Sequence, residues 1–172
     1  MNAQPETTLA ELIRYNNWAN QQVLEACQKL GEDQLATPIP GAYGTIRDTL
    51  THMITSEASY VRLLTGSRPQ PSFQLEDQPS LAELMAFAAQ VGTALVDAVN
   101  RVPLTHRLSE EWQDRQLHYN ALLVFIQIVN HGIEHRTNIT TVLNQKQQNP
   151  PGVDGWSYLL AHPGRFEPKR DD

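Results

Sequence analysis

The chain has 172 residues, 40% hydrophobic and 19% charged, which predicts one folded domain over residues 1–172 and excludes a disordered chain. Its 13 Lys and Arg against 19 Asp and Glu give a net charge of −6. This balance argues against nucleic acid as the main partner, because phosphate binding needs a cationic face.

The single cysteine, Cys27, excludes an intrachain disulfide and a zinc site built from cysteines. It is typical of a reducing compartment, so we expect a cytoplasmic protein. We expect no signal peptide, since residues 1–8 are polar and lack a basic segment followed by an apolar run. We also expect no membrane partner, because the most apolar stretch, residues 121–129, is too short to span a bilayer.

The first element is a long amphipathic helix. Apolar residues recur at three- and four-residue steps from about residue 7 to residue 30, and Gly31 is a plausible end. Residues 37–44 contain two prolines and two glycines, which predict a loop.

Capping residues place the next two helices. Thr45, followed three residues later by an aspartate, predicts the start of a helix that runs to about residue 65 and ends at a glycine. Residues 67–79 carry three prolines and predict an extended linker. Ser80 and Glu83 form a capping-box pattern, which predicts a third helix to about residue 100.

The last third of the chain contains one ambiguous segment and one strong helix. Residues 105–119 allow either a short hairpin or an irregular loop. The fourth helix is predicted over about residues 120–145, and its first half is apolar on every side, which predicts a central, well-buried helix. Asp154 predicts the cap of a short helix over residues 155–161, and the tail from Pro163 is expected to be loose. The fold class is therefore all-α, a four-helix bundle with a short C-terminal helix.

Two histidines one helical turn apart, His131 and His135, are the sharpest local feature. At about 100° per residue, the two imidazoles lie roughly 40° apart on the stripe that faces the core. Such a pair can chelate a divalent ion, but it can also be two polar residues hydrogen-bonded to backbone or water. The position after the first histidine is Gly132, where a zinc protease carries glutamate, which argues against a metalloprotease.

A catalytic zinc generally needs a third protein ligand, and four other histidines are candidates. His106 and His118 lie in the ambiguous segment, and His162 lies near the C-terminus. His52 lies within the second helix, about 120° from the centre of its apolar residues and among small polar residues. That flank predicts either plain surface or the wall of a wet pocket between helices.

Three motifs, taken together, resemble the DinB family of small helical-bundle proteins. They are Tyr15–Asn20; Tyr43–Met53 with Glu57, Tyr60 and Leu63–Gly66; and Asn130–Arg136. Their order and spacing also match, over roughly the first 145 residues. The resemblance implies a bundle that is often a homodimer, with a divalent metal ion, zinc or nickel, on His52, His131 and His135. Family members commonly continue the last motif with Gly-Gln, whereas this chain has Thr137-Asn138, which puts the shape of the pocket beside the metal in doubt.

The resemblance also implies thiol chemistry, because characterised relatives are thiol S-transferases that use low-molecular-weight thiols such as bacillithiol, or mycothiol-dependent isomerases. Three neutral imidazoles leave a divalent ion with its full charge and an open position, where it can lower the pKa of a water or hold a thiolate. We therefore expect a metal-dependent enzyme that transfers a thiol to a small electrophilic substrate, or hydrolyses it. Two alternatives stay open: a metal- or small-ligand-binding stress-response protein without turnover, and a bundle that serves as an interaction partner.

Further residues are expected to support the site. Asn138, one turn beyond His135, is predicted to orient that imidazole. Glu57 falls within an apolar face and needs a partner, which gives it a structural role. The candidate partners are Arg136, Asn16 and Asn20. Trp18 and Tyr60 are expected to pack or to line the cleft, whereas Cys27, on the apolar stripe of the first helix, is expected to pack in the core and not to act as a nucleophile.

Overall fold

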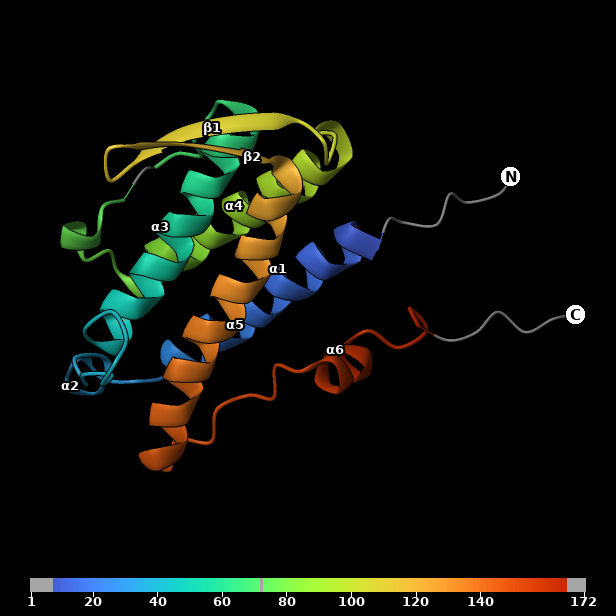
Figure 1. Ribbon diagram of the computed structural model, residues 1–172. Coiled ribbons are helices and arrows are strands. Elements are labelled where there is room, and N and C mark those ends of the chain that lie inside the picture. Colours follow the sequence, from blue (N-terminus) through green and yellow to red (C-terminus); the bar gives the residue numbers. More distant parts are fainter. Residues whose placement is uncertain (1–7, 72, 167–172) are drawn as a thin grey trace, which may run out of the picture.

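Four long helices form the body of the molecule in the computed structural model, which describes residues 8–71 and 73–166 (Figure 1). They are α1 (Thr8–Cys27), α3 (Ile46–Thr65), α4 (Leu81–Arg101) and α5 (Ala121–Gln145). The shorter elements are α2 (Glu32–Leu35), the 3-10 helix η1 (Leu75–Asp77), the strands β1 (Arg107–Trp112) and β2 (Arg115–Asn120), and α6 (Gly155–Ala161). The predicted four-helix bundle is confirmed, with a small hairpin added. Most of the tail that was expected to be loose, residues 167–172, lies outside the described residues.

The capping residues act as the sequence predicts. The Thr45 hydroxyl accepts a hydrogen bond from the Asp48 N–H, and the Asp48 carboxylate accepts one from the Thr45 N–H. Ser80 and Glu83 make the same reciprocal pair at the start of α4. Gly66 ends α3 in the left-handed conformation, with φ 76°, which favours glycine. These local bonds fix where the two helices begin and where α3 ends.

The first helix ends earlier than predicted. It stops at Cys27 and is followed by a turn, and Gly31 is the N-cap of the one-turn helix α2 instead of the end of α1. The apolar pattern continues past Cys27 because Leu30 still packs against the core from the turn. A hydrophobic pattern records burial and does not by itself record helical geometry.

The packing order of the helices decides where the site lies. Both α1 and α3 pack against α4 and α5, so α1 lies diagonally across the bundle from α3, and α4 diagonally from α5. Helix α4 is long and apolar enough, by length and composition alone, to cross a membrane. In the bundle, α1 and α3 pack against it.

The ambiguous segment forms an antiparallel hairpin that lies across one end of α3 and α5 (Figure 1). Its register pairs Arg107 with Asn120 and Trp112 with Arg115. The two turn residues, Gln113 and Asp114, both have positive φ, the conformation of tight two-residue hairpin turns. The choice that the sequence left open is thus decided in favour of the hairpin.

The prediction that the first half of α5 is buried on every side is wrong. The side chains of Leu122, Leu123 and Ile126 are 41%, 51% and 55% exposed. Because α5 stands at one corner of the bundle, its neighbours α1 and α3 cover only the side that faces them. The outer side is apolar and open.

Candidate metal centre

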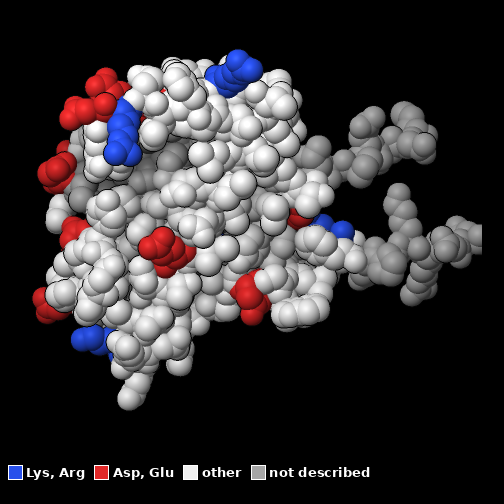
Figure 2. Space-filling model, in the orientation of Figure 1, with Lys and Arg blue, Asp and Glu red and all other residues white. Residues whose placement is uncertain are grey.

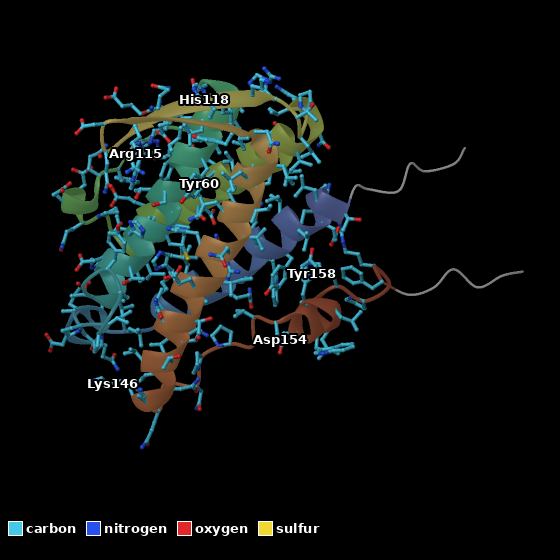
Figure 3. All side chains as sticks on the ribbon, viewed as in Figure 1. Tyr60, Arg115, His118, Lys146, Asp154 and Tyr158 are labelled. Atoms are coloured by element: carbon cyan, nitrogen blue, oxygen red, sulfur yellow. The ribbon has the colours of Figure 1, made fainter. Side chains whose placement is uncertain are left out.

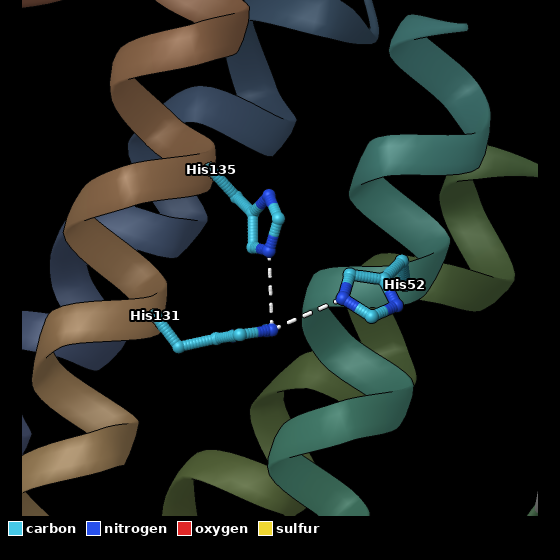
Figure 4. Close-up of side chains that lie close together, drawn as sticks. All are labelled: His52, His131 and His135. Carbon is cyan, nitrogen blue, oxygen red and sulfur yellow. Dashed lines mark hydrogen bonds between the residues drawn. The ribbon is translucent and has the colours of Figure 1, made fainter. Parts of the chain in front are cut away.

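Three imidazoles from two helices point toward one another between α3 and α5 (Figure 4). The Nε2 atom of His131 lies 3.1 Å from Nε2 of His52 and 3.1 Å from Nε2 of His135. The three candidate ligand nitrogens all lie within 4.8 Å of one another. The structure therefore brings together the three side chains that the sequence and the family resemblance singled out.

The other three histidines lie elsewhere. His118 is on the exposed hairpin at one end of the bundle (Figure 3), and His106 just precedes β1. His162 follows α6, and its ring lies against Trp18 and Tyr158. Within residues 8–71 and 73–166, none of them belongs to a group of three possible metal ligands.

The position of His52 follows from the packing of α3 against two neighbouring helices. Helix α3 packs against both α4 and α5, and the polar flank that carries His52 and the buried Thr49 belongs to the side near α5. His131 and His135 are one turn apart on α5, so both rings face that same side. The flank that could have been plain surface is instead one wall of the cluster.

The cluster has the chemistry of a metal site. Burial, together with the neighbouring imidazole of His135, lowers the pKa of His131 to about 3 and that of His52 to about 4. Burial also lowers the pKa of His135. All three rings are therefore neutral at pH 7 and offer lone pairs. Two nitrogens bound about 2.05 Å from a tetrahedral ion lie roughly 3.3 Å apart, and the two 3.1 Å spacings around His131 are close to this value.

Among the described residues, no protein group holds the Nδ1 side of the two α5 rings. The Nδ1 atoms of His131 and His135 are buried and have no hydrogen-bond partner within the described chain. Asn138 is only half-buried and makes no hydrogen bond to His135, so its predicted orienting role is wrong. Its short side chain does not reach Nδ1.

Two tyrosines form aromatic walls around the cluster. The Tyr43 ring stacks on His52, with centroids 3.4 Å apart and planes 10° apart. The Tyr60 ring meets His131 edge-on, with centroids 5.8 Å apart, and its hydroxyl accepts a hydrogen bond from Gln127. Burial raises the pKa of Tyr60, so its phenol stays protonated. Tyr60 thus lines the site, as expected.

Sequence reasoning missed Tyr43 as a site residue, and for Trp18 it left open whether the ring packs or lines the cleft. Tyr43 belongs to a loop between two glycines with positive φ, Gly41 and Gly44, where periodicity gives no information about direction. Trp18 packs against Tyr158 of α6, with ring centroids 5.1 Å apart, and so serves the packing of the C-terminal helix.

A buried polar network lies directly behind the histidines. One carboxylate oxygen of Glu57, Oε1, accepts hydrogen bonds from the side-chain amides of Asn16 (2.8 Å) and Asn20 (2.9 Å). The Arg136 guanidinium donates to the oxygens of the same two amides. All four side chains are at most 2% exposed. The predicted partners of Glu57 are confirmed, and the asparagines carry the link between the two charges.

Gly132 makes room for this network. A Cβ atom at this position would collide with the Asn16 amide oxygen and with an Arg136 guanidinium nitrogen. The slot that zinc proteases fill with glutamate therefore needs the smallest residue here. Because Gly132 follows one histidine of the pair and Arg136 follows the other, the network lies directly beside the two histidines on α5.

Comparison with known proteins agrees with this architecture. The family model described as the DinB family matches residues 1–170. The chain belongs to the DinB family. It is 25% identical over 171 residues to Protein DinB of Bacillus subtilis (strain 168), covering 87% of this chain and 92% of that protein. A crystal structure of a DinB-like protein from Bacillus cereus ATCC 10987 superposes with a TM-score of 0.66 at 20% identity, covering 85% of this chain and 95% of that one. This DinB-family chain thus has the family's fold and three histidines that could hold a metal ion.

Proposed function

We propose that this DinB-family chain binds one divalent ion, zinc or nickel, on His52, His131 and His135 and is a metal-dependent enzyme. Its reaction would be transfer of a low-molecular-weight thiol to a small electrophile, or hydrolysis of that electrophile. The observation that carries the proposal is the convergence of three neutral imidazole nitrogens, which suit both metals. Such a set leaves part of the coordination shell for a substrate.

The ion would supply Lewis acidity, which lowers the pKa of a water or thiol at its open position. The side chains of the protein itself would bind and orient the substrate. Tyr43 and Tyr60 shield the cluster with aromatic surface. Because Gln127 donates to the Tyr60 hydroxyl, the phenol hydrogen is left to donate to an oxygen of the substrate.

The chain's own thiol takes no part in this proposal. Cys27 is fully buried on α1, and burial raises the pKa of its thiol to about 12. A thiol with such a pKa is not a nucleophile at neutral pH. The reacting thiol would therefore be a small molecule from the reducing cytoplasm, in which we place the protein.

One observation favours a second candidate, a metal- or small-ligand-binding stress-response protein without turnover. Among the described residues, no carboxylate bonds to any of the three histidines. The Glu57 carboxylate is bonded to Asn16 and Asn20 in the core and is not free to move a proton. A reaction that needs a carboxylate base beside the ion would find none here.

A thiol-consumption assay distinguishes these proposals. The purified chain, loaded with zinc or with nickel, is mixed with a low-molecular-weight thiol and the model electrophile 1-chloro-2,4-dinitrobenzene. We expect thiol consumption above the uncatalysed rate, lost in His131→Ala and kept in His118→Ala, whose histidine is on the hairpin. Metal binding without turnover of any thiol or hydrolysis of the electrophile would favour the second candidate. Failure to bind either metal would overturn the proposed enzyme and the metal-binding form of the second candidate.

A further inference from the structure

A cavity of about 680 Å³ lies between α1 and α6. Its volume is within the range of sites that bind small molecules, about 300–1,000 Å³. None of the three clustered histidines lines it, so it is separate from the candidate metal centre. Its walls are mostly apolar, and the large side chains that form them are those of Leu12, Tyr15, Trp156, Tyr158, Leu159 and Phe166. We call this space the α6 cavity.

Long-range hydrogen bonds hold α6 on α1 and so form the α6 cavity. The Tyr158 hydroxyl donates to Oε1 of Glu11 at 2.8 Å, and the Arg165 guanidinium donates to both oxygens of that carboxylate. The Tyr15 hydroxyl donates to the backbone carbonyl of Val153 at 2.8 Å. Because both tyrosine hydroxyls are bonded within the protein, the two tyrosines contribute ring surface to the cavity. A ligand would therefore meet a cavity that is already formed, which lowers the entropic cost of binding.

Four aromatic rings line the α6 cavity, those of Tyr15, Trp156, Tyr158 and Phe166. The ring of Tyr158 lies against two of the others, with its centroid 5.6 Å from that of Tyr15 and 5.6 Å from that of Phe166. The Trp156 side chain is 77% exposed, so its ring is accessible to a ligand. Aromatic faces carry partial negative charge and attract ammonium groups, and the face of tryptophan attracts them most strongly. Several rings around one space are an arrangement in which proteins bind organic cations.

The charges that line the cavity also favour a cation. The charged residues of the described chain that line it are both acidic, Glu11 and Asp154. Arg165 neutralises Glu11, whereas Asp154, at the start of α6 (Figure 3), has no ion pair with a described basic residue. Asp154 accepts a hydrogen bond from the Ser157 N–H but stays exposed, so its negative charge is available at the cavity. Figure 2 shows the surface over α6 as largely uncharged, with carboxylates at its edge.

We infer that the α6 cavity binds a small organic cation, an ammonium group attached to an apolar chain or ring. The apolar part would fill the cavity, and the aromatic rings together with Asp154 would surround the charge. Asp154 would repel an anionic ligand, because its full charge exceeds the partial positive charge, about half a unit, at the start of a helix. The net charge of −6 on the whole chain further favours the approach of a cation. A cation should therefore bind more tightly than an uncharged molecule of the same shape.

A titration with two molecules of the same shape tests this inference. The full isotope-labelled chain is titrated with 3-hydroxyphenyltrimethylammonium or with its uncharged analogue, 3-tert-butylphenol. The indole and amide signals of Trp156 in NMR spectra report the binding. We expect saturable binding of the cation, roughly 2- to 30-fold tighter than that of the phenol, which is the range of a cation–π contact.

Three variants test whether the cation binds in the α6 cavity. Trp156→Ala should weaken cation binding by a similar factor, read from the other amide signals of α6. Trp112→Ala, which removes an equally accessible ring from the hairpin, should leave it unchanged. Asp154→Asn keeps a capping side chain but removes the charge, so it should weaken binding of the cation roughly 1.5- to 5-fold and leave that of the phenol unchanged.

Three results would overturn the inference. The first is the absence of saturable cation binding at millimolar concentrations. The second is equal affinity for the cation and the phenol, which would show an apolar cavity that does not recognise charge. The third is cation binding that Trp156→Ala leaves unchanged, which would place the ligand outside the α6 cavity.

Discussion

Replacing Gly132 with alanine should destabilise the fold, although alanine is the better helix former. Inside a helix, alanine is favoured over glycine by about 1 kcal/mol. Against this, the new Cβ would displace either the Asn16 amide or the Arg136 guanidinium, each at most 1% exposed. Overpacking a core costs about 1–3 kcal/mol, and loss of the charged hydrogen bond between Arg136 and Asn16 costs about 1.5–3 kcal/mol more. We expect a net loss of about 1.5–5 kcal/mol in the free energy of unfolding.

Urea unfolding followed by circular dichroism measures this loss. Gly155→Ala is the matched control, because Gly155 is also a helical glycine but a Cβ there would meet no atom within 4 Å. Asn16→Ala removes the oxygen with which the Cβ collides. The double variant Asn16→Ala with Gly132→Ala should therefore cost less than the two single changes together, by roughly 1 kcal/mol or more. A Gly132→Ala protein as stable as the wild type would refute the reasoning.

Three further predictions follow from the site and the core. Without metal, the free energy of unfolding should fall as the pH drops from about 6.5 toward 4, because the lowered pKa values of His52 and His131 make the unfolded chain bind protons first. Urea titrations at several pH values in EDTA test this. A smaller fall is expected in His131→Asn. Tyr43→Ala should weaken zinc binding by roughly 2- to 12-fold, the value of one aromatic stack, in a calorimetric titration; an unchanged affinity would assign the stack no role. The buried Cys27 thiol should react with a chromogenic disulfide only after denaturation, and rapid reaction of the native chain would contradict its placement.

The long helices could be predicted because local signals mark their ends. Thr45 with Asp48, and Ser80 with Glu83, make the capping bonds that their spacing predicts. The hairpin could not be decided, because its turn is Gln113-Asp114 and lacks the glycine that usually marks such a turn. The exposed side of α5 could not be predicted either, since an apolar residue that faces the core and one that is exposed look alike in a sequence.

The positions of the histidines, too, could be predicted in part from local signals and depend in part on tertiary packing. The spacing of His131 and His135 places them on one face of a helix, and this needs no tertiary information. His52 lies away from the apolar centre of its own helix, and only the packing of α3 between α4 and α5 shows that its flank faces the pair. A partner for Glu57 could be expected, because a carboxylate on an apolar face needs compensation, and the structure links Glu57 to Arg136 through Asn16 and Asn20. The failure of Asn138 to reach His135 depends on side-chain geometry that a helical wheel does not contain.

The most direct measurement is the metal stoichiometry of the purified chain. Cobalt(II), a spectroscopic stand-in for zinc, is titrated into the metal-free protein and its visible absorption is recorded. We expect one ion per chain with the intense bands of a four-coordinate site, lost in His52→Ala and in His131→Ala and kept in His118→Ala. Binding that survives the loss of His52, or no binding by the wild-type chain, would contradict a centre built from α3 and α5 together.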